Sequence, residues 1–163
     1  MNLCRDAEAS GSLEPDFTQC VWTLETLEIT QQLGQHLARH LPRGSILLLQ
    51  GELGAGKTSL VQGLAQACGI AEPITSPTFA LAQHYPDGNP PLVHLDLYRL
   101  EGAGSADELF LQEEEEARAM GALMAVEWPE RLRLALPEAW RLELSYLKTG
   151  RRAQLTPPKN AST

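Results

Sequence analysis

Residues 46–58, ILLLQGELGAGKT, carry the clearest structural signal in this chain. The apolar first half of this stretch is typical of a buried β-strand, and its second half is a glycine-rich loop that opens a helix. The Walker A pattern requires two glycines, a lysine and a hydroxyl side chain at fixed spacing. The residues at these positions are Gly51, Gly56, Lys57 and Thr58. The stretch therefore predicts a loop that holds the phosphates of a nucleotide at a helix N-terminus.

The side chains of this loop also predict what it binds. In a P-loop, the lysine reaches the β- and γ-phosphates, and the hydroxyl that follows it coordinates Mg²⁺. We therefore expect ATP and Mg²⁺ as ligands, with Lys57 acting on the phosphates and Thr58 on the metal.

A P-loop with a bound metal needs an acidic side chain, which usually ends a neighbouring apolar strand. Asp96 in PLVHLDL and Glu127 at the end of ALMAVE both qualify. The carboxyl ends of parallel strands meet at one edge of a sheet, so both residues are expected near the nucleotide. We predict Lys57, Asp96 and Glu127 as catalytic residues, and Asp96 and Glu127 also as metal-site residues. The residues alone leave open which one contacts the metal and which one orients the attacking water. Each is otherwise explained as a solvated carboxylate at a strand end.

The segments on either side of the loop alternate between strand-like and helix-like patterns. Strands are expected at residues 21–24, 45–50, 79–85, 92–97, 123–127, 140–148 and 152–156, and helices at 27–41, 57–68, 105–119 and just after Pro129. This alternation predicts an α/β fold of the P-loop NTPase type. We expect a parallel core sheet with antiparallel edge strands and helices on both faces.

Length and composition are those of a globular protein. The chain has 163 residues, of which 43% are hydrophobic and 21% charged. We expect a flexible N-terminal extension at 1–18, a single ATPase domain at 19–156 and a disordered tail at 157–163. No apolar run is long enough for a membrane span, and the polar, acidic N-terminus lacks the apolar core of a secretory signal. Three widely spaced cysteines favour reduced thiols, and we expect a cytoplasmic location without membrane contact.

The net charge of −8 bears on possible partners. Proteins that bind nucleic acid on their own usually carry a basic patch, whereas the lysines and arginines here are scattered. We therefore expect any RNA in the function of this chain to be held by a partner protein.

Four blocks of sequence, in this order and spacing, resemble the TsaE family, formerly called YjeE. They are GELGAGKTSL at 51–60, ITSPTFALAQHY at 74–85, HLDLYRLEG at 94–102 and EWPERL at 127–132. The resemblance covers about residues 21–155. It implies an ATPase that binds Mg²⁺ and ATP, is slow alone, and acts with the TsaB and TsaD proteins. Together these make threonylcarbamoyladenosine beside the tRNA anticodon; the ATPase meets tRNA only through the complex and is required for turnover rather than for the transfer itself.

The same resemblance assigns roles to single residues. It places Thr30 near the adenine, Ser76 and Thr78 in a loop that senses the nucleotide, and Trp128 beside the nucleotide. It makes Glu127 the stronger metal candidate and matches Arg151, or else Arg152, to a basic residue near the C-terminal strands. Its cofactor-binding P-loop residues are Leu53, Gly54, Ala55, Gly56, Lys57, Thr58 and Ser59. Two positions depart from the family pattern, Glu113 and Ala117, where a glycine and an aromatic residue are usual.

Several residues also have plain structural interpretations. Trp128 taken alone is interpreted as a core or surface aromatic residue, whereas the extended backbone that Pro129 favours before it would direct it at the site. His94 in an apolar strand is interpreted as a core histidine, and Arg99 as an ion-pair partner rather than an arginine finger. The run Glu113–Glu116 is interpreted as a solvated helix face.

Two other functions compete with the ATPase. A small-molecule P-loop kinase would use the same cradle, but it needs a lid and several arginines around the transferred group, and no arginine-rich lid segment follows the loop. A nucleotide switch without useful hydrolysis would also keep the cradle. Asp96 and Glu127 argue only mildly against this second alternative.

Overall fold

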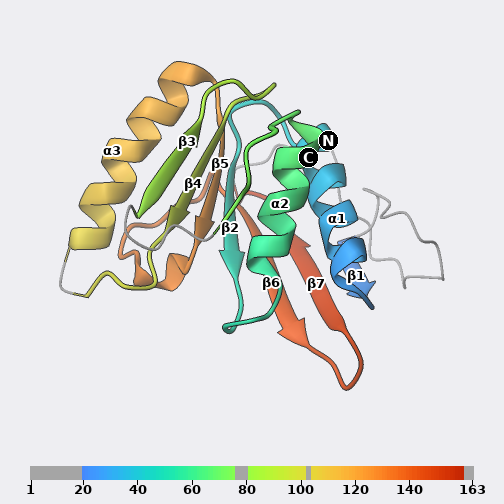
Figure 1. Ribbon diagram of the computed structural model, residues 1–163. Helices are drawn as coiled ribbons and strands as arrows, with labels where there is room; N and C mark the ends of the chain where they lie inside the picture. The colour runs from blue at the N-terminus through green and yellow to red at the C-terminus, as the bar shows by residue number, and fades with distance from the viewer. Residues whose placement is uncertain (1–19, 76–80, 102–103, 160–163) are drawn as a thin grey trace.

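The computed structural model describes residues 20–75, 81–101 and 104–159, which form one seven-stranded sheet with helices on both faces. The strands lie in the order β1-β7-β6-β2-β5-β4-β3 (Figure 1). The strands are β1 (Val21–Leu24), β2 (Ile46–Gln50), β3 (Ala82–Tyr85), β4 (Leu92–Asp96), β5 (Leu123–Glu127), β6 (Trp140–Tyr146) and β7 (Arg151–Thr156). The α/β fold class is confirmed.

The centre of the sheet is parallel and both of its edges are antiparallel. β2 pairs in parallel with β5 and β6, and β4 pairs in parallel with β5. β3 closes one edge antiparallel to β4, and β7 and β1 extend the other edge beyond β6. The central strands are buried almost throughout, whereas β6 and β7 alternate between buried and exposed residues. This difference arises because helices cover the central strands from both sides.

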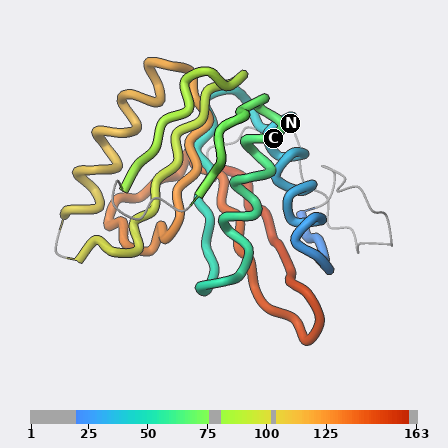
Figure 2. The backbone as a smooth tube through the Cα atoms, viewed as in Figure 1, coloured from blue at the N-terminus to red at the C-terminus, as the bar shows by residue number. Residues whose placement is uncertain are grey.

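Helices α1 (Leu27–His40) and α2 (Lys57–Ala67) lie side by side on one face of the sheet, and α3 (Ser105–Met120) lies on the other (Figure 2). Thr26 caps α1, because its side-chain oxygen accepts a hydrogen bond of 3.2 Å from the N–H of Ile29. The helix then buries Leu33 and Leu37, as its apolar spacing predicts.

Two glycines bring α1 and α2 into backbone contact. A Cβ atom on Gly63 would lie 2.0 Å from the carbonyl oxygen of Gln31, and one on Gly34 would lie 2.2 Å from that of Leu60. Such distances leave no room for a side chain at either position. The close contact fixes α2, whose first residue is Lys57, against α1.

The interpretation of Glu113–Glu116 as a solvated run is wrong at its first residue. Glu113 is 8% exposed and forms an ion pair with His84 of β3. The departure from the family pattern at Glu113 and Ala117 leaves α3 unbroken, and both side chains are buried against its own face of the sheet. The Glu113 carboxylate requires a partner such as His84, because burying a carboxylate without one costs free energy.

The remaining expectations concern the two termini, the cysteines and membrane spans. The extension at 1–18 and all but the first residues of the tail at 157–163 lie outside the described residues. Cys20 is disulfide-bonded, so the expectation of reduced thiols is wrong at this residue. Cys68 is a buried free thiol. Within the described ranges, every helix is too short or too polar to cross a membrane.

Candidate nucleotide-binding site

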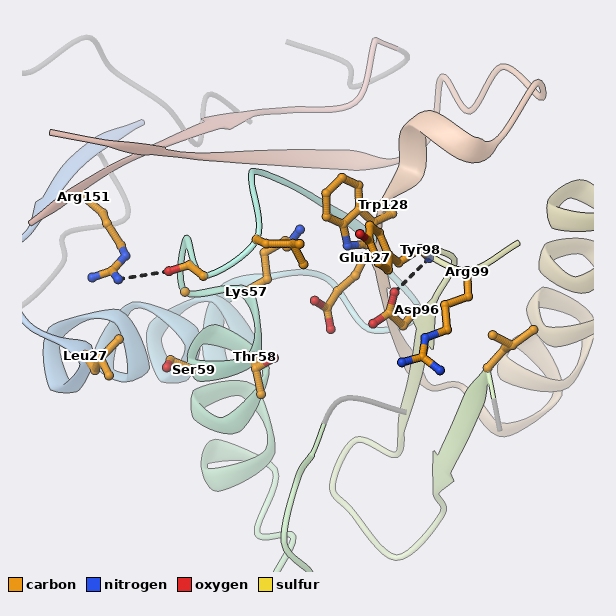
Figure 3. Close-up of a pocket in the computed structure, with 14 residues that line it drawn as sticks. Leu27, Lys57, Thr58, Ser59, Asp96, Tyr98, Arg99, Glu127, Trp128 and Arg151 are labelled. Carbon is orange, nitrogen blue, oxygen red and sulfur yellow. Dashed lines mark hydrogen bonds between the residues drawn. The ribbon is translucent and has the colours of Figure 1, made fainter. Parts of the chain in front are cut away.

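A cavity of about 440 Å³ opens where β2, β4 and β5 end and α2 begins. This is the crevice in which parallel α/β sheets bind ligands, and its volume is within the usual range for small-molecule sites. The side chains around it converge from several elements (Figure 3). Its walls include most of the predicted residues: Leu53, Gly54, Gly56, Lys57, Thr58, Ser59, Asp96, Glu127, Trp128 and Arg151.

The loop itself has the backbone that a phosphate cradle requires. Gly54 and Gly56 have φ angles of 78° and 107°, a region that side chains with a Cβ rarely adopt. Gly56 also caps α2, so the free N–H groups of the first helical turn face the cavity end of the helix. At the start of the loop, a Cβ on Gly51 would lie 2.7 Å from the carbonyl oxygen of Leu144. Steric constraints thus explain why each Walker A position for glycine is occupied by glycine.

Lys57 is held in place by two contacts. Its Nζ donates a hydrogen bond of 2.5 Å to the carbonyl oxygen of Gly51 and lies 3.7 Å from the ring centroid of Trp128. Burial lowers the pKa of Lys57, and the charges of Glu127, Glu130 and Asp96 oppose this shift. The lysine is therefore placed in advance at the wall of the cavity, where it costs little further ordering to meet a phosphate.

Asp96 and Glu127 are direct neighbours across the β4–β5 pair, as their positions at two strand ends predicted. Asp96 Oδ1 accepts a hydrogen bond of 3.0 Å from the N–H of Tyr98. Glu127 is only 3% exposed, and its Oε2 lies 2.6 Å from Nε2 of His94. Both carboxylates share the cavity with Thr58 (Figure 3). A hydroxyl and two carboxylates are the hard oxygen donors that Mg²⁺ prefers, so the donor set fits this cation.

Trp128 adopts a left-handed backbone, with φ 60° and ψ 51°, instead of the expected extended one. Pro129 favours an extended backbone for the residue before it, so the left-handed conformation of Trp128 departs from this preference. This conformation costs about 1–2 kcal/mol. It directs the indole ring over Lys57 and 4.7 Å from the ring of Tyr98, and these contacts offset the strain.

The structure distinguishes the two adjacent arginines of β7. Arg151 lines the cavity, and its Nη2 donates a hydrogen bond of 3.0 Å to the carbonyl oxygen of Gly54. Arg152 is exposed on the opposite face of the strand, where it contacts Gln154. Arg151 is therefore the one placed to contact a bound ligand.

Not every predicted residue reaches the cavity wall. Thr30 and Ala55 are fully buried. The Thr30 hydroxyl donates to the carbonyl oxygen of Thr26, and its methyl group packs behind Gly56. Their contact with a nucleotide stays a prediction. Ser76 and Thr78 lie outside the described residues.

Sequence reasoning missed some members of the site. Tyr98, Leu27 and Leu81 line the cavity, and the signal for Tyr98 was its place two residues after Asp96 in the DLYRL block. Arg99 also lines the cavity and forms no salt bridge with any described residue, so the structure does not support its interpretation as an ion-pair partner.

Comparisons with known proteins agree with one another. The family model "Threonylcarbamoyl adenosine biosynthesis protein TsaE" matches residues 24–154. The chain is 51% identical over 113 residues to the tRNA threonylcarbamoyladenosine biosynthesis protein TsaE of Synechocystis sp., covering 67% of this chain and 69% of that protein. It is 44% identical to the protein of that name from Nostoc sp., covering 80% and 81%.

A solved structure shares the fold. The crystal structure of YdiB from Bacillus subtilis matches with a TM-score of 0.67 and 29% identity, covering 86% of each chain. The TsaE protein of Bacillus subtilis is 34% identical over 132 residues, with 81% of this chain and 80% of that protein covered. The chain therefore belongs to the TsaE family.

Proposed function

We propose that this chain binds ATP with Mg²⁺ and hydrolyses it, and that it serves tRNA threonylcarbamoyladenosine biosynthesis. One observation carries the ATPase proposal: a P-loop lysine and hydroxyl, Lys57 and Thr58, share a single cavity with Asp96 and Glu127. The link to tRNA modification comes from the membership of the chain in the TsaE family.

Different residues of the site would bind the phosphates and the metal. The N–H groups of the loop and of the first turn of α2 hold the phosphates, and Lys57 adds a positive charge beside them. Thr58, Asp96 and Glu127 would hold the metal, which supplies charge neutralisation on the phosphates. Glu127 is the more deeply buried of the two carboxylates, so we propose that it contacts the metal directly. Asp96 would then lie beside the metal and orient the attacking water.

The proposal includes partner proteins. We propose that the chain acts with TsaB and TsaD in the cytoplasm and meets tRNA only through them. The net charge of −8 supports this indirect contact, since a strongly acidic protein repels the RNA backbone.

The proposal is tested by reconstituting the modification from purified proteins. TsaB, TsaD, activated threonylcarbamoyl donor and tRNA are mixed with ATP and Mg²⁺, and modified nucleoside is measured over many turnovers. The wild-type chain should support repeated turnover, and the Lys57→Ala variant should not. Equal product with and without the chain would refute the role in modification, and equal product with both chains would refute the role of the cradle.

A further inference from the structure

His94 is a fully buried histidine whose only polar contact in the described chain is the Glu127 carboxylate. Its side chain is 0% exposed, and its Nε2 lies 2.6 Å from Oε2 of Glu127, itself 3% exposed. Its Nδ1 has no hydrogen-bond partner among the described residues. A buried histidine usually forms hydrogen bonds through both ring nitrogens. A buried histidine whose single hydrogen bond goes to a carboxylate of the site therefore requires an explanation.

The positions of the two residues place His94 behind the site. His94 and Asp96 are two residues apart on β4, so their side chains share one face of the sheet, and Asp96 faces Glu127 across the β4–β5 pair. Asp96 and Glu127 line the cavity, but His94 does not. His94 therefore contacts Glu127 from the side away from the cavity.

The chemistry of this contact fixes the carboxylate. A histidine protonated at Nε2 donates to Oε2 of Glu127, and the second carboxylate oxygen then remains for the cavity. A hydrogen bond to a carboxylate is strong, and burial keeps water from competing for it. Without the donor, the Glu127 carboxylate would be free to rotate about its last bond and to turn both oxygens away from the cation.

We propose that His94 is a positioning residue that orients Glu127 toward a magnesium ion bound with the nucleotide. This inference rests on the proposed magnesium–nucleotide site. Partners that orient metal ligands commonly contribute 10- to 100-fold to metal affinity, so an effect of about that size is expected. The competing interpretation is a core histidine that only fills space between β4 and the neighbouring elements.

Three substitutions separate positioning from packing. His94→Gln keeps an amide donor close to the place of Nε2, whereas His94→Asn has a shorter side chain that does not reach Glu127. His94→Leu removes the donor and keeps most of the volume. His84→Leu is the matched control, because His84 is also paired with a glutamate, Glu113, but outside the cavity.

The experiment is isothermal titration of ADP into the full chain, once with Mg²⁺ and once with EDTA, together with thermal melting. The measured quantity is the ratio of the two affinities. We expect the ratio to fall about 10- to 100-fold in His94→Asn and His94→Leu, to recover in His94→Gln, and to stay unchanged in His84→Leu. Affinity in EDTA should stay close to wild type in all four variants.

Two results would overturn the inference alone. One is an unchanged ratio of the two ADP affinities in His94→Asn. The other is a loss of ADP affinity that is equal with Mg²⁺ and with EDTA in both His94→Asn and His94→Gln, which would indicate a packing role for His94. If His94→Leu does not fold, the comparison of His94→Asn with His94→Gln still distinguishes positioning from packing. A wild-type chain that binds ADP equally with Mg²⁺ and EDTA would instead overturn the proposed magnesium site and this inference together.

Discussion

Lys57 lies in an environment where two effects oppose each other. Burial lowers its pKa, and the nearby carboxylates of Glu127, Glu130 and Asp96 act to raise it. A buried cation costs free energy that its partners offset only in part, so Lys57 contributes little to stability, and the role we propose for it is contact with the bound phosphates.

Replacing Lys57 therefore affects binding far more than stability. In Lys57→Ala, we expect ATP affinity or turnover to fall by about 100-fold or more, the usual effect of losing one preorganised charge at a phosphate. The free energy of unfolding should change by less than about 1 kcal/mol, because the lost contacts and the relieved burial cost oppose each other. Lys148→Ala is the control, since Lys148 is exposed in the β6–β7 turn. Full ATP affinity together with full turnover in Lys57→Ala would contradict the assignment of the cradle.

Trp128 provides a fluorescence signal for the same site. Its ring lies over Lys57 at the cavity wall, whereas Trp22 and Trp140 are buried in the core beneath α1 and α2. Adding ADP and Mg²⁺ should change the tryptophan emission of the wild-type chain. Trp128→Phe should remove this change and Trp22→Phe should keep it. A change that persists in Trp128→Phe would show that the nucleotide binds elsewhere.

At the scale of elements, the contact between α1 and α2 positions the loop. Gly34 and Gly63 allow the two helices to approach until a Cβ would meet a backbone carbonyl. α2 carries Lys57 and Thr58 in its first turn, so a shift of α2 would move both side chains.

The Gly63→Ala substitution tests this contact, because the sign of the change in unfolding free energy depends on it. Alanine in an unconstrained helix stabilises by about 1 kcal/mol relative to glycine. Here its Cβ would lie 2.0 Å from the carbonyl oxygen of Gln31, so the helices must separate, at a typical cost of about 1–3 kcal/mol. Urea unfolding of Gly63→Ala should show a net loss of stability. Gln32→Ala, at an exposed position of α1, is the control and should change stability by less than about 0.5 kcal/mol. A stabilised Gly63→Ala would refute the close contact.

Most elements could be predicted from local pattern, and the exceptions have physical causes. The apolar runs of β2 and β5 and the four-residue spacing of α1 mark these elements in the sequence alone. The left-handed Trp128 and the buried Glu113 were not predictable, because each depends on a contact with a distant residue, Lys57 in one case and His84 in the other.

At the scale of the whole molecule, the site is assembled from segments far apart in sequence. Arg151 of β7 donates a hydrogen bond to Gly54, and the order of the sheet makes Asp96 the neighbour of Glu127. The sequence predicted that the two carboxylates would meet, since both end parallel strands. It left Arg151 and Arg152 undecided, because only the pairing of β7 fixes which arginine faces the loop.

Hydrolysis of ATP in this cavity is measured as ADP formation in the presence of TsaB, TsaD and Mg²⁺. The comparison is between the wild-type chain and Glu127→Gln, which keeps the size of the side chain and removes its charge. We expect multiple turnovers by the wild type and a rate slower by about 100-fold or more in Glu127→Gln. Equal rates for the two chains, or no ADP above the level that TsaB and TsaD form alone, would contradict hydrolysis in this cavity.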